Sequence, residues 1–366
     1  MVSELVGVSG AEPDELEGAG EAGEDVVDVS AAQAVSDTSR ASDPAARRDR
    51  GTEALYGPVM ADEQQHDQHA HGHDHHQAPG DRDWAEFGAR LQLEGDVAMP
   101  VIADAIARLA AAAQDTGLEI DRILDVGSGP GVAAIALAAA FPGVSAVAVD
   151  ASAPLLELVA NRAIAHGVGD RVHTQVADLE QSLGELGAAD VVWASMVLHH
   201  VAAPGDTLRR LHDLLRPGGL LAIVEFGSTR STLPVGFDVG EGNGAAGAEA
   251  GGFVARHAAA VHDAVAAHLP PGAMTIDWPL LLADAGFTVL EQGEIAMHLP
   301  APLGEVERRF VLQGLQMSLR MVAERLDAAD IDTLEALASE DGPRSVLGRD
   351  DLSLDVTRAF FLARRA

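Results

Sequence analysis

Short apolar segments alternate with helical segments between residues 120 and 225, and this alternation constrains the fold more than any other feature of the sequence. The apolar segments are residues 122–126, 144–149, 172–176, 190–194 and 220–225, and the helical ones are 132–140, 154–166 and 207–215. Strands that are apolar on both faces and joined by helices are typical of parallel sheets with helices on both sides. The pattern predicts a doubly wound α/β domain.

The segments outside this alternation are less regular. Helices are predicted at 97–113, 255–268, 280–285, 306–326 and 328–337, and strands at 287–299 and 354–362. Residues 228–252 are rich in Gly and Ala, which predicts a flexible insertion. Asp327 is placed to cap the helix that follows it.

The first 80 residues have the composition of a disordered tail. They hold 17 Asp and Glu against 4 Arg and few large apolar side chains, so they bury too little surface to offset the entropy of ordering. Near the end of the tail are six closely spaced histidines: His66, His69, His71, His73, His75 and His76. Imidazoles bind nickel, zinc or copper; the alternative is a solvated low-complexity segment with adventitious affinity for divalent metal.

Composition excludes several classes of function. The formal net charge of −33 disfavours nucleic acid as a partner, because phosphates would be repelled. The absence of cysteine excludes disulfides and thiolate chemistry. An acidic N-terminus and the lack of an apolar run of about 18 residues indicate neither a secretion signal nor a membrane span. We therefore expect a cytoplasmic protein that does not bind membranes; its oligomeric state is not indicated.

A glycine-rich loop lies between the first predicted strand and its helix, with the sequence Asp125-Val-Gly127-Ser128-Gly129-Pro-Gly131. Glycines in such a loop let the backbone approach a ligand and aim N–H groups at it. A dinucleotide fingerprint, G-x-G-x-x-G, would require glycine at position 132, where Val132 stands. The carboxylate of Asp125 would repel a pyrophosphate, whereas it suits a cationic ligand.

Two further carboxylates come directly after predicted strands. Asp150 ends the second strand, where it can accept both hydroxyls of a ribose, and Asp178 ends the third, where it can accept from an adenine amino group. Each one alone is also compatible with a turn or a helix cap. Together with Asp125 they mark one edge of the sheet, and ligands bind at that edge of open α/β sheets.

These motifs, with 190–201 and Leu215-Arg-Pro-Gly-Gly219, resemble those of class I S-adenosylmethionine-dependent methyltransferases. The most similar group acts on small molecules and includes ubiquinone/menaquinone methylases and trans-aconitate methyltransferase. The resemblance covers residues 84–366, most strongly 120–227. It implies a Rossmann-like seven-stranded sheet whose last strand is antiparallel. The expected core is 118–227, 286–300 and 352–366, with an insertion or cap at 228–280 and a helical cap at 302–340, following the tail at 1–80.

The resemblance also implies roles for individual residues. S-adenosylmethionine would be the cofactor, with its methionine part held by Asp125 and the loop residues Gly127, Ser128, Gly129 and Gly131. Asp150 would take the ribose, with Ala151 beside it, and Asp178 and Leu179 would flank the adenine. Ser195 would line the cofactor from the segment after the fourth strand. No metal is expected in this site.

Methyl transfer needs proximity, orientation and sometimes a general base. The favoured base is His200, then His199, because the segment 193–201 lines the cleft between cofactor and acceptor in similar enzymes; Glu225 is a weaker candidate. The alternative is that the histidine pair caps a helix or packs the cleft wall. Met317 and Met321 are more typical of packing than of contact with an acceptor.

Three functions remain open, and the first is favoured: a methyltransferase acting on a small-molecule acceptor. The second is a non-catalytic protein that binds adenosylmethionine or handles metal through its histidine tract. The third is an NAD(P)-dependent oxidoreductase, which Val132 and Asp125 oppose. The segments outside the core are expected to cover the acceptor and exclude water.

Overall fold

The computed structural model describes residues 83–181, 183–231 and 252–366. The strands are β1 (Arg122–Val126), β2 (Ser145–Asp150), β3 (Val172–Val176), β4 (Ala189–Ser195), β5 (Leu215–Ser231), β6 (Phe287–Leu299) and β7 (Leu354–Arg365). The helices are α1 (Trp84–Val97), α2 (Met99–Thr116), α3 (Val132–Ala140), α4 (Ala153–Ala165), α5 (Pro204–Leu214), α6 (Phe253–His268), α7 (Trp278–Asp284), α8 (Glu305–Val322) and α9 (Ala328–Leu337). Short 3-10 turns include η4 (Leu198–His200) and η6 (Ala323–Arg325).

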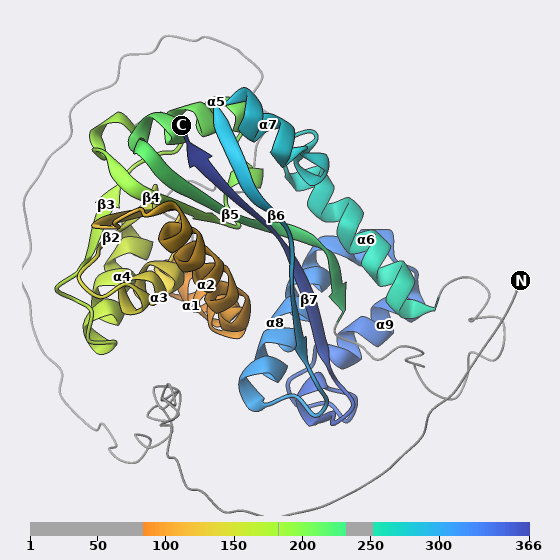
Figure 1. Cartoon of the computed structure of the whole chain (residues 1–366). Helices are drawn as coiled ribbons and strands as arrows, with labels where there is room; N and C mark the ends of the chain where they lie inside the picture. Colours follow the sequence, from red (N-terminus) through yellow and green to blue (C-terminus); the bar gives the residue numbers. More distant parts are fainter. Residues whose placement is uncertain (1–82, 182, 232–251) are drawn as a thin grey trace, which may run out of the picture. The chain divides into compact units, whose positions relative to one another are not determined.

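The seven strands form one sheet in the order β3-β2-β1-β4-β5-β7-β6. Strands β1 to β5 pair in parallel, whereas β7 runs antiparallel to both of its neighbours, β5 and β6. This confirms the predicted fold class, a Rossmann-like sheet with an antiparallel last strand. Figure 1 shows the long strands β5, β6 and β7 continuing toward α8 and α9.

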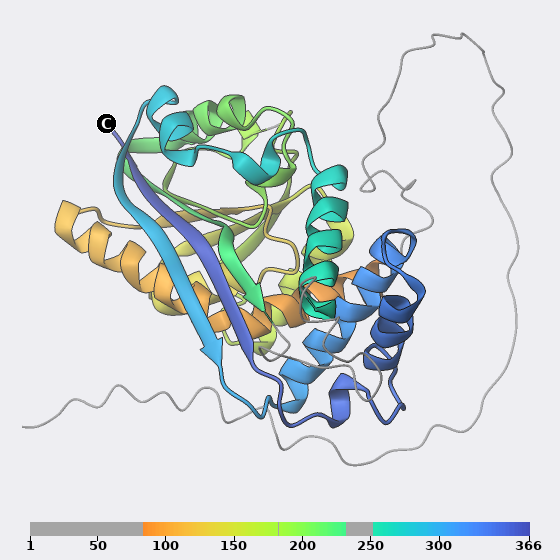
Figure 2. The same cartoon turned by 90° about the vertical axis from the view of Figure 1, so that its right-hand side faces the viewer.

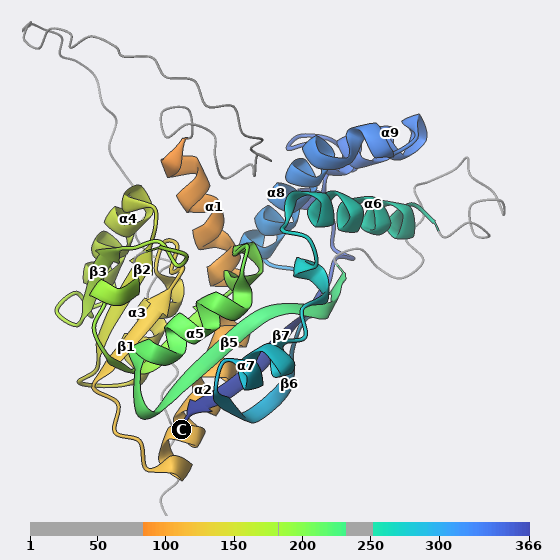
Figure 3. The ribbon, with the colours of Figure 1, turned by 90° about the horizontal axis from the view of Figure 1, so that it is seen from above.

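Alternate side chains of the strands enter different buried clusters, of which the described residues form three. On one face, Ile123, Trp193 and Phe360 pack with the apolar sides of α2 and α8. On the other face, Leu124 and Ile223 pack with α5 and α7. Figures 2 and 3 show these helices on opposite sides of the sheet. Burial on both faces explains why the central strands are almost entirely apolar.

Helix α1 lies ahead of the region where the sequence predicted regular structure. Asp83 caps it by accepting hydrogen bonds from the backbone N–H groups of Ala85 (3.0 Å) and Glu86 (3.1 Å). The helix packs closely on α3, because a Cβ added at Gly95 would lie 2.6 Å from Val132. The predicted helix at 97–113 is in fact the end of α1 and most of α2, with Ala98 between them.

Strand β5 is longer than the sequence predicts. It begins at Leu215, directly after α5 (Pro204–Leu214), whereas the sequence predicts a helix over 207–215 and a strand only from 220, and it continues to Ser231. The start of the predicted insertion is therefore strand, because β7 supplies a hydrogen-bonding partner as far as Ser231. The rest of that insertion's Gly-rich part, 232–251, lies outside the described residues, as do the predicted tail and its histidine tract.

Among the residues that the structure describes, no helix is both long enough and apolar enough to cross a bilayer.

Candidate functional site

The glycine-rich loop joins β1 to α3 at the carboxyl end of the sheet. Gly127, Gly129 and Gly131 have φ values of +68°, +52° and +78°, a region that residues with a Cβ rarely adopt. The N–H of Ser128 donates to the carbonyl of Val149 on β2, at 3.0 Å. The glycines are therefore required by the path of the loop, which keeps it against the end of β2.

Asp150, at the end of β2, organises this loop. Its Oδ2 accepts a hydrogen bond from the Gly129 N–H at 2.9 Å, and its Oδ1 accepts one from the Ser152 N–H at 2.8 Å. Burial raises the pKa of Asp150, and the backbone N–H groups partly offset this effect. A carboxylate has about four acceptor positions, and the backbone N–H groups do not occupy all of them, so Asp150 can also accept from a hydroxyl group while it still holds the loop.

Asp125 is a buried carboxylate inside β1, with 1% of its surface exposed. Its Oδ2 has no hydrogen-bond donor in the part of the chain that the structure describes. Burial raises its pKa from 3.8 to about 7, the Ala134 backbone N–H lowers it, and the charge of Asp150 raises it further. A buried acceptor without a donor is unfavourable in the empty protein and favours a ligand that brings a cation.

Two other buried polar atoms near this strand also have no partner among the described residues: Ser128 Oγ and Trp193 Nε1. Trp193 lies on β4 directly beside Asp125 in the sheet register. Native proteins leave few such groups unsatisfied. Their concentration around Asp125 indicates that this region is completed by a ligand or by water.

The remaining predicted cofactor residues lie along the same edge of the sheet. Asp178 follows β3 and accepts from the Glu180 N–H (2.8 Å) and from Gln181 Nε2 (2.9 Å). Leu179 is buried, Ala151 is exposed, and Ser195 is half-buried at the end of β4. The structure thus brings the predicted residues to the ends of β1 to β4; their contacts with a cofactor stay a prediction.

The segment after β4 packs directly on the glycine-rich loop. A Cβ added at Gly127 would lie 2.2 Å from a methyl group of Val197. The preceding residue, Met196, has a φ of +53° and donates its N–H to the Val224 carbonyl on β5, at 2.8 Å. A non-glycine residue in this conformation is strained, and such strain clusters at functional sites. The two loops that face the site therefore have a fixed separation.

Glu225 of β5, which directly follows the last residue of β5 that pairs with β4, holds that segment through hydrogen bonds. Its Oε1 accepts the N–H groups of Val197 (3.2 Å) and Leu198 (2.8 Å). Its Oε2 contacts Nδ1 of His199 at 2.6 Å. Glu225 and His199 are 2% and 3% exposed, whereas His200 is exposed and its ring centre lies 4.0 Å from that of His199. The carboxylate and His199 are thus one buried unit.

Two contacts that the sequence did not indicate cover the glycine-rich loop. Leu91 of α1 lies 3.7 Å from the position of a Cβ at Gly129. Arg162 of α4 donates to the Pro130 carbonyl at 2.9 Å and pairs with Asp96 of α1 at 3.3 Å. The signal for α1 was present, because an acid at an N-cap followed three residues later by glutamate is a helix-start pattern.

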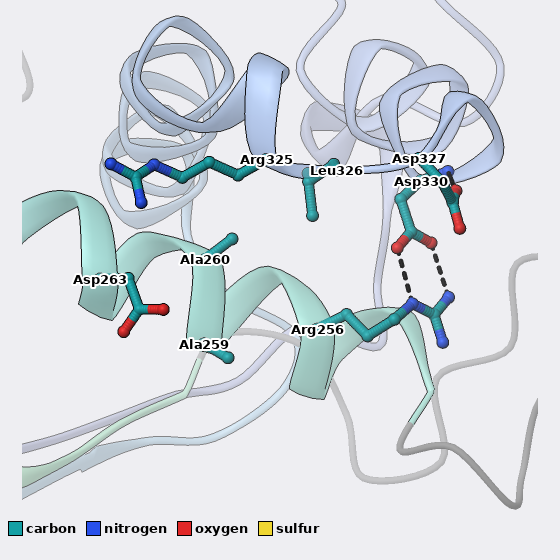
Figure 4. A pocket seen from close by; sticks show the side chains of 8 residues that line it. All are labelled: Arg256, Ala259, Ala260, Asp263, Arg325, Leu326, Asp327 and Asp330. Carbon is teal, nitrogen blue, oxygen red and sulfur yellow. Dashed lines mark hydrogen bonds and ion pairs between the residues drawn. The ribbon is translucent and has the colours of Figure 1, made fainter.

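A pocket of about 430 Å³ lies elsewhere, between α6 and the η6–α9 segment. Figure 4 shows Arg256 of α6 forming a bidentate ion pair with Asp330 of α9, with distances of 2.7 and 2.6 Å. None of its lining residues belongs to the glycine-rich loop or to the segment after β4. The candidate site is therefore located by the geometry of the glycine-rich loop and by the unpartnered polar groups, and not by this pocket.

Residues 124–221 match a family model described as a methyltransferase domain. The matched range contains the glycine-rich loop, Asp150, Asp178 and His199. Residues 124–221 are a class I methyltransferase domain. The predicted family and its cofactor, S-adenosylmethionine, are confirmed for this domain.

Two curated relatives match the methyltransferase domain. The 27-O-demethylrifamycin SV methyltransferase of Amycolatopsis mediterranei (strain S699) is 37% identical over 106 residues, which are 29% of this chain and 39% of that protein. The malonyl-(acyl-carrier protein) O-methyltransferase of Laribacter hongkongensis (strain HLHK9) is 32% identical over 111 residues, 29% of this chain and 37% of that protein. The chain therefore spans just under two fifths of the length of these relatives.

Among solved structures, a geranyl diphosphate methyltransferase in complex with SAM matches with a TM-score of 0.39 and 15% identity. The match covers 79% of this chain and 92% of that one. A likeness this distant carries no information on the acceptor.

Proposed function

We propose that this chain transfers the methyl group of S-adenosylmethionine to a small-molecule acceptor. The observation that carries the proposal is Asp125 Oδ2, a buried acceptor with no donor among the described residues. Leaving such a group unpaired costs about 1–3 kcal/mol, and an ammonium group would relieve that cost. S-adenosylmethionine supplies this ammonium together with a methyl group activated on a sulfonium.

The other residues at the sheet edge fit the remaining parts of the cofactor. The positive φ values of Gly127 and Gly129 let the loop turn tightly after β1, so that its backbone can lie beside the cofactor. Asp150 would accept the ribose hydroxyls on its remaining lone pairs, with Ala151 beside it. Asp178 and Leu179 would flank the adenine, and Ser195 would contact the cofactor from β4. Two carboxylates, Asp125 and Asp150, would repel the pyrophosphate of a dinucleotide.

The segment after β4 would present the acceptor to the methyl group. It packs on the glycine-rich loop through Val197 and Gly127, so an acceptor held on this segment would lie beside the cofactor; for transfer it must approach the methyl carbon from the side opposite to sulfur. This in-line approach lowers the barrier by orientation. By their names, one relative acts on 27-O-demethylrifamycin SV and the other is an O-methyltransferase, which supports an oxygen acceptor. His200 and His199 are the candidate bases in this segment.

Calorimetry with S-adenosylmethionine, S-adenosylhomocysteine and NADH tests the proposal. We expect the first two to bind and NADH not to bind. Asp150→Asn should weaken binding at least about tenfold, because an amide cannot accept two hydroxyls and hold the Gly129 N–H at once.

The matched control is Asp170→Asn. Asp170 is exposed and lies just before β3, at the amino ends of the strands and away from the proposed site. This substitution should leave the affinity for S-adenosylmethionine unchanged. Tight NADH binding, or an unchanged affinity in Asp150→Asn, would contradict the proposal.

A further inference from the structure

Glu225 and His199 form a buried, hydrogen-bonded pair, which neither a helix cap nor the packing of a cleft wall requires. Two strands, β4 and β5, bring the side chains together, and both are at least nine-tenths buried. We propose that His199 is the general base of the transfer, that Glu225 is its positioning residue, and that the acceptor is therefore a neutral hydroxyl. This inference rests on the proposed methyltransferase function.

The contacts of Glu225 fit a carboxylate that orients His199. Its Oε1 accepts the N–H groups of Val197 and Leu198, and its Oε2 lies 2.6 Å from Nδ1 of His199. A carboxylate only accepts hydrogen bonds. In the proposal Glu225 is this acceptor, so the hydrogen of His199 lies on Nδ1.

The other ring nitrogen of His199 is consequently a lone-pair acceptor. Nε2 receives no hydrogen bond from the described part of the chain. The ring orientation is fixed on both sides, since Phe226 lies 4.3 Å and His200 lies 4.0 Å from it, centre to centre. His199 is two residues from Val197, which contacts Gly127 of the cofactor loop. The basic nitrogen thus belongs to the segment that faces the proposed methyl group.

A base held in this way matters only for an acceptor that must lose a proton. As the acceptor oxygen forms its bond to the methyl carbon, the carbon–sulfur bond breaks with its electron pair going to sulfur, and the hydroxyl proton goes to His199 Nε2. Glu225 stabilises the imidazolium that results. Alcohols and phenols need this help near neutral pH. Carboxylates do not, because near neutral pH they carry no proton at the attacking atom.

A second histidine–carboxylate contact in the chain provides a matched comparison. Nδ1 of His298 lies 2.6 Å from Asp355, the same distance as in the proposed pair. Their side chains are 62% and 43% exposed. His298 lies near the end of β6, and Asp355 lies near the start of β7. The distance alone is thus not distinctive. Burial, together with the two extra backbone donors on the carboxylate, distinguishes His199 and Glu225.

The tautomer is tested by ¹⁵N–¹H NMR of the full-length chain labelled at histidine, at pH 8. The His199 signals are identified as those missing from His199→Asn. We expect the Nδ1–H tautomer in the unmodified protein and the Nε2–H tautomer in Glu225→Gln, because the glutamine amide would donate to Nδ1. An Nε2–H tautomer in the unmodified protein, or no change in Glu225→Gln, would overturn the assignment.

Catalysis is tested with isotope-labelled S-adenosylmethionine and a small-molecule extract, with the labelled product identified by mass spectrometry and NMR. His199→Asn keeps a donor to Glu225 but lacks Nε2, so transfer should fall at least about 100-fold. Glu225→Gln should lose a comparable factor through the wrong tautomer. His298→Asn is the control and should retain full activity. S-adenosylhomocysteine affinity, measured on each variant, should stay unchanged.

Each other result has a defined meaning. Transfer retained in His199→Asn, or lost in His200→Asn instead, would overturn the assignment of the base. A label on nitrogen, carbon, sulfur or a carboxylate would overturn the acceptor class. These outcomes leave the proposed function intact, whereas failure of the unmodified protein to bind S-adenosylmethionine, or to label any product, would overturn the proposed function as well.

Discussion

At the scale of single residues, Asp125 shows what the proposed binding site costs the ligand-free protein in stability. A carboxylate that is 1% exposed and lacks a donor on one oxygen is expensive to ionise. Its pKa rises from 3.8 to about 7, first through burial and then through Asp150. Between these two pH values the folded chain keeps a proton that the unfolded chain releases. Stability therefore falls as pH rises through that window.

Asp125→Asn should remove this penalty. At pH 8 we expect the ligand-free variant to melt several degrees higher than the unmodified protein, with a smaller difference at pH 5, where Asp125 is largely protonated. S-adenosylmethionine should stabilise the unmodified protein but hardly stabilise the variant, because the ammonium loses its carboxylate. Thermal melts at both pH values, with and without cofactor, measure all three effects. A variant less stable than the unmodified protein at pH 8 would argue against a penalty at this residue.

At the scale of elements, the site depends on two loops held at a fixed distance. The loop after β1 and the segment after β4 meet where Gly127 faces Val197. β1 and β4 are neighbours in the sheet, and Glu225 of β5 holds the second loop from the adjacent strand. Small changes at this contact should therefore affect cofactor binding and the position of His199 together.

Gly127→Ala should destabilise the protein by more than Gly117→Ala. The two glycines have nearly the same φ, +68° and +67°, but a Cβ at Gly117 meets nothing within 4 Å. Gly117→Ala thus measures the backbone strain alone, about 1–2 kcal/mol. Val197→Ala in the Gly127→Ala background should recover part of the excess, because it removes the methyl groups at 2.2 and 3.1 Å but keeps the Val197 Cβ at 2.7 Å. Chemical denaturation measures these differences, and equal losses in the two single variants would show that the loop contact is not tight.

At the scale of the whole molecule, strand order decides where chemistry can occur. The chain passes from β1 outward through β2 to β3, then returns to β4 on the other side of β1. Ligands bind at such a reversal because the loops there diverge to opposite sides of the sheet. The glycine-rich loop and the His199 segment are the two loops at this point. Every residue proposed to bind or react comes from the described ranges 83–181 and 183–231.

Removing residues 1–80 should therefore leave S-adenosylmethionine affinity within about twofold, because Asp83, the cap of α1, is retained. The same truncation should abolish nickel binding if the six histidines at 66–76 are its source. Calorimetry with each ligand on the full-length and truncated chains tests both expectations. A large loss of cofactor affinity would assign the tail a role in the site.

The sequence by itself determined the strands β1 to β7, the glycine-rich loop and the acids at the ends of β1, β2 and β3. These features are local: apolar periodicity marks a strand, and a residue's place at a strand end follows from that strand alone. The same locality explains the errors. The extension of β5 to Ser231 depends on pairing with β7, a partner far along the chain, and no local signal reports such pairing.

Only the tertiary structure decided which of the candidate groups lie in contact. Sequence reasoning ranked His200 above His199 and treated Glu225 as a separate candidate, whereas the fold places Glu225 against His199 and leaves His200 exposed. The fold also buries Asp125, which is 1% exposed. Burial and hydrogen-bond partners depend on which strands become neighbours. The sequence therefore identified the residues, but only the order of the strands assigned their partners.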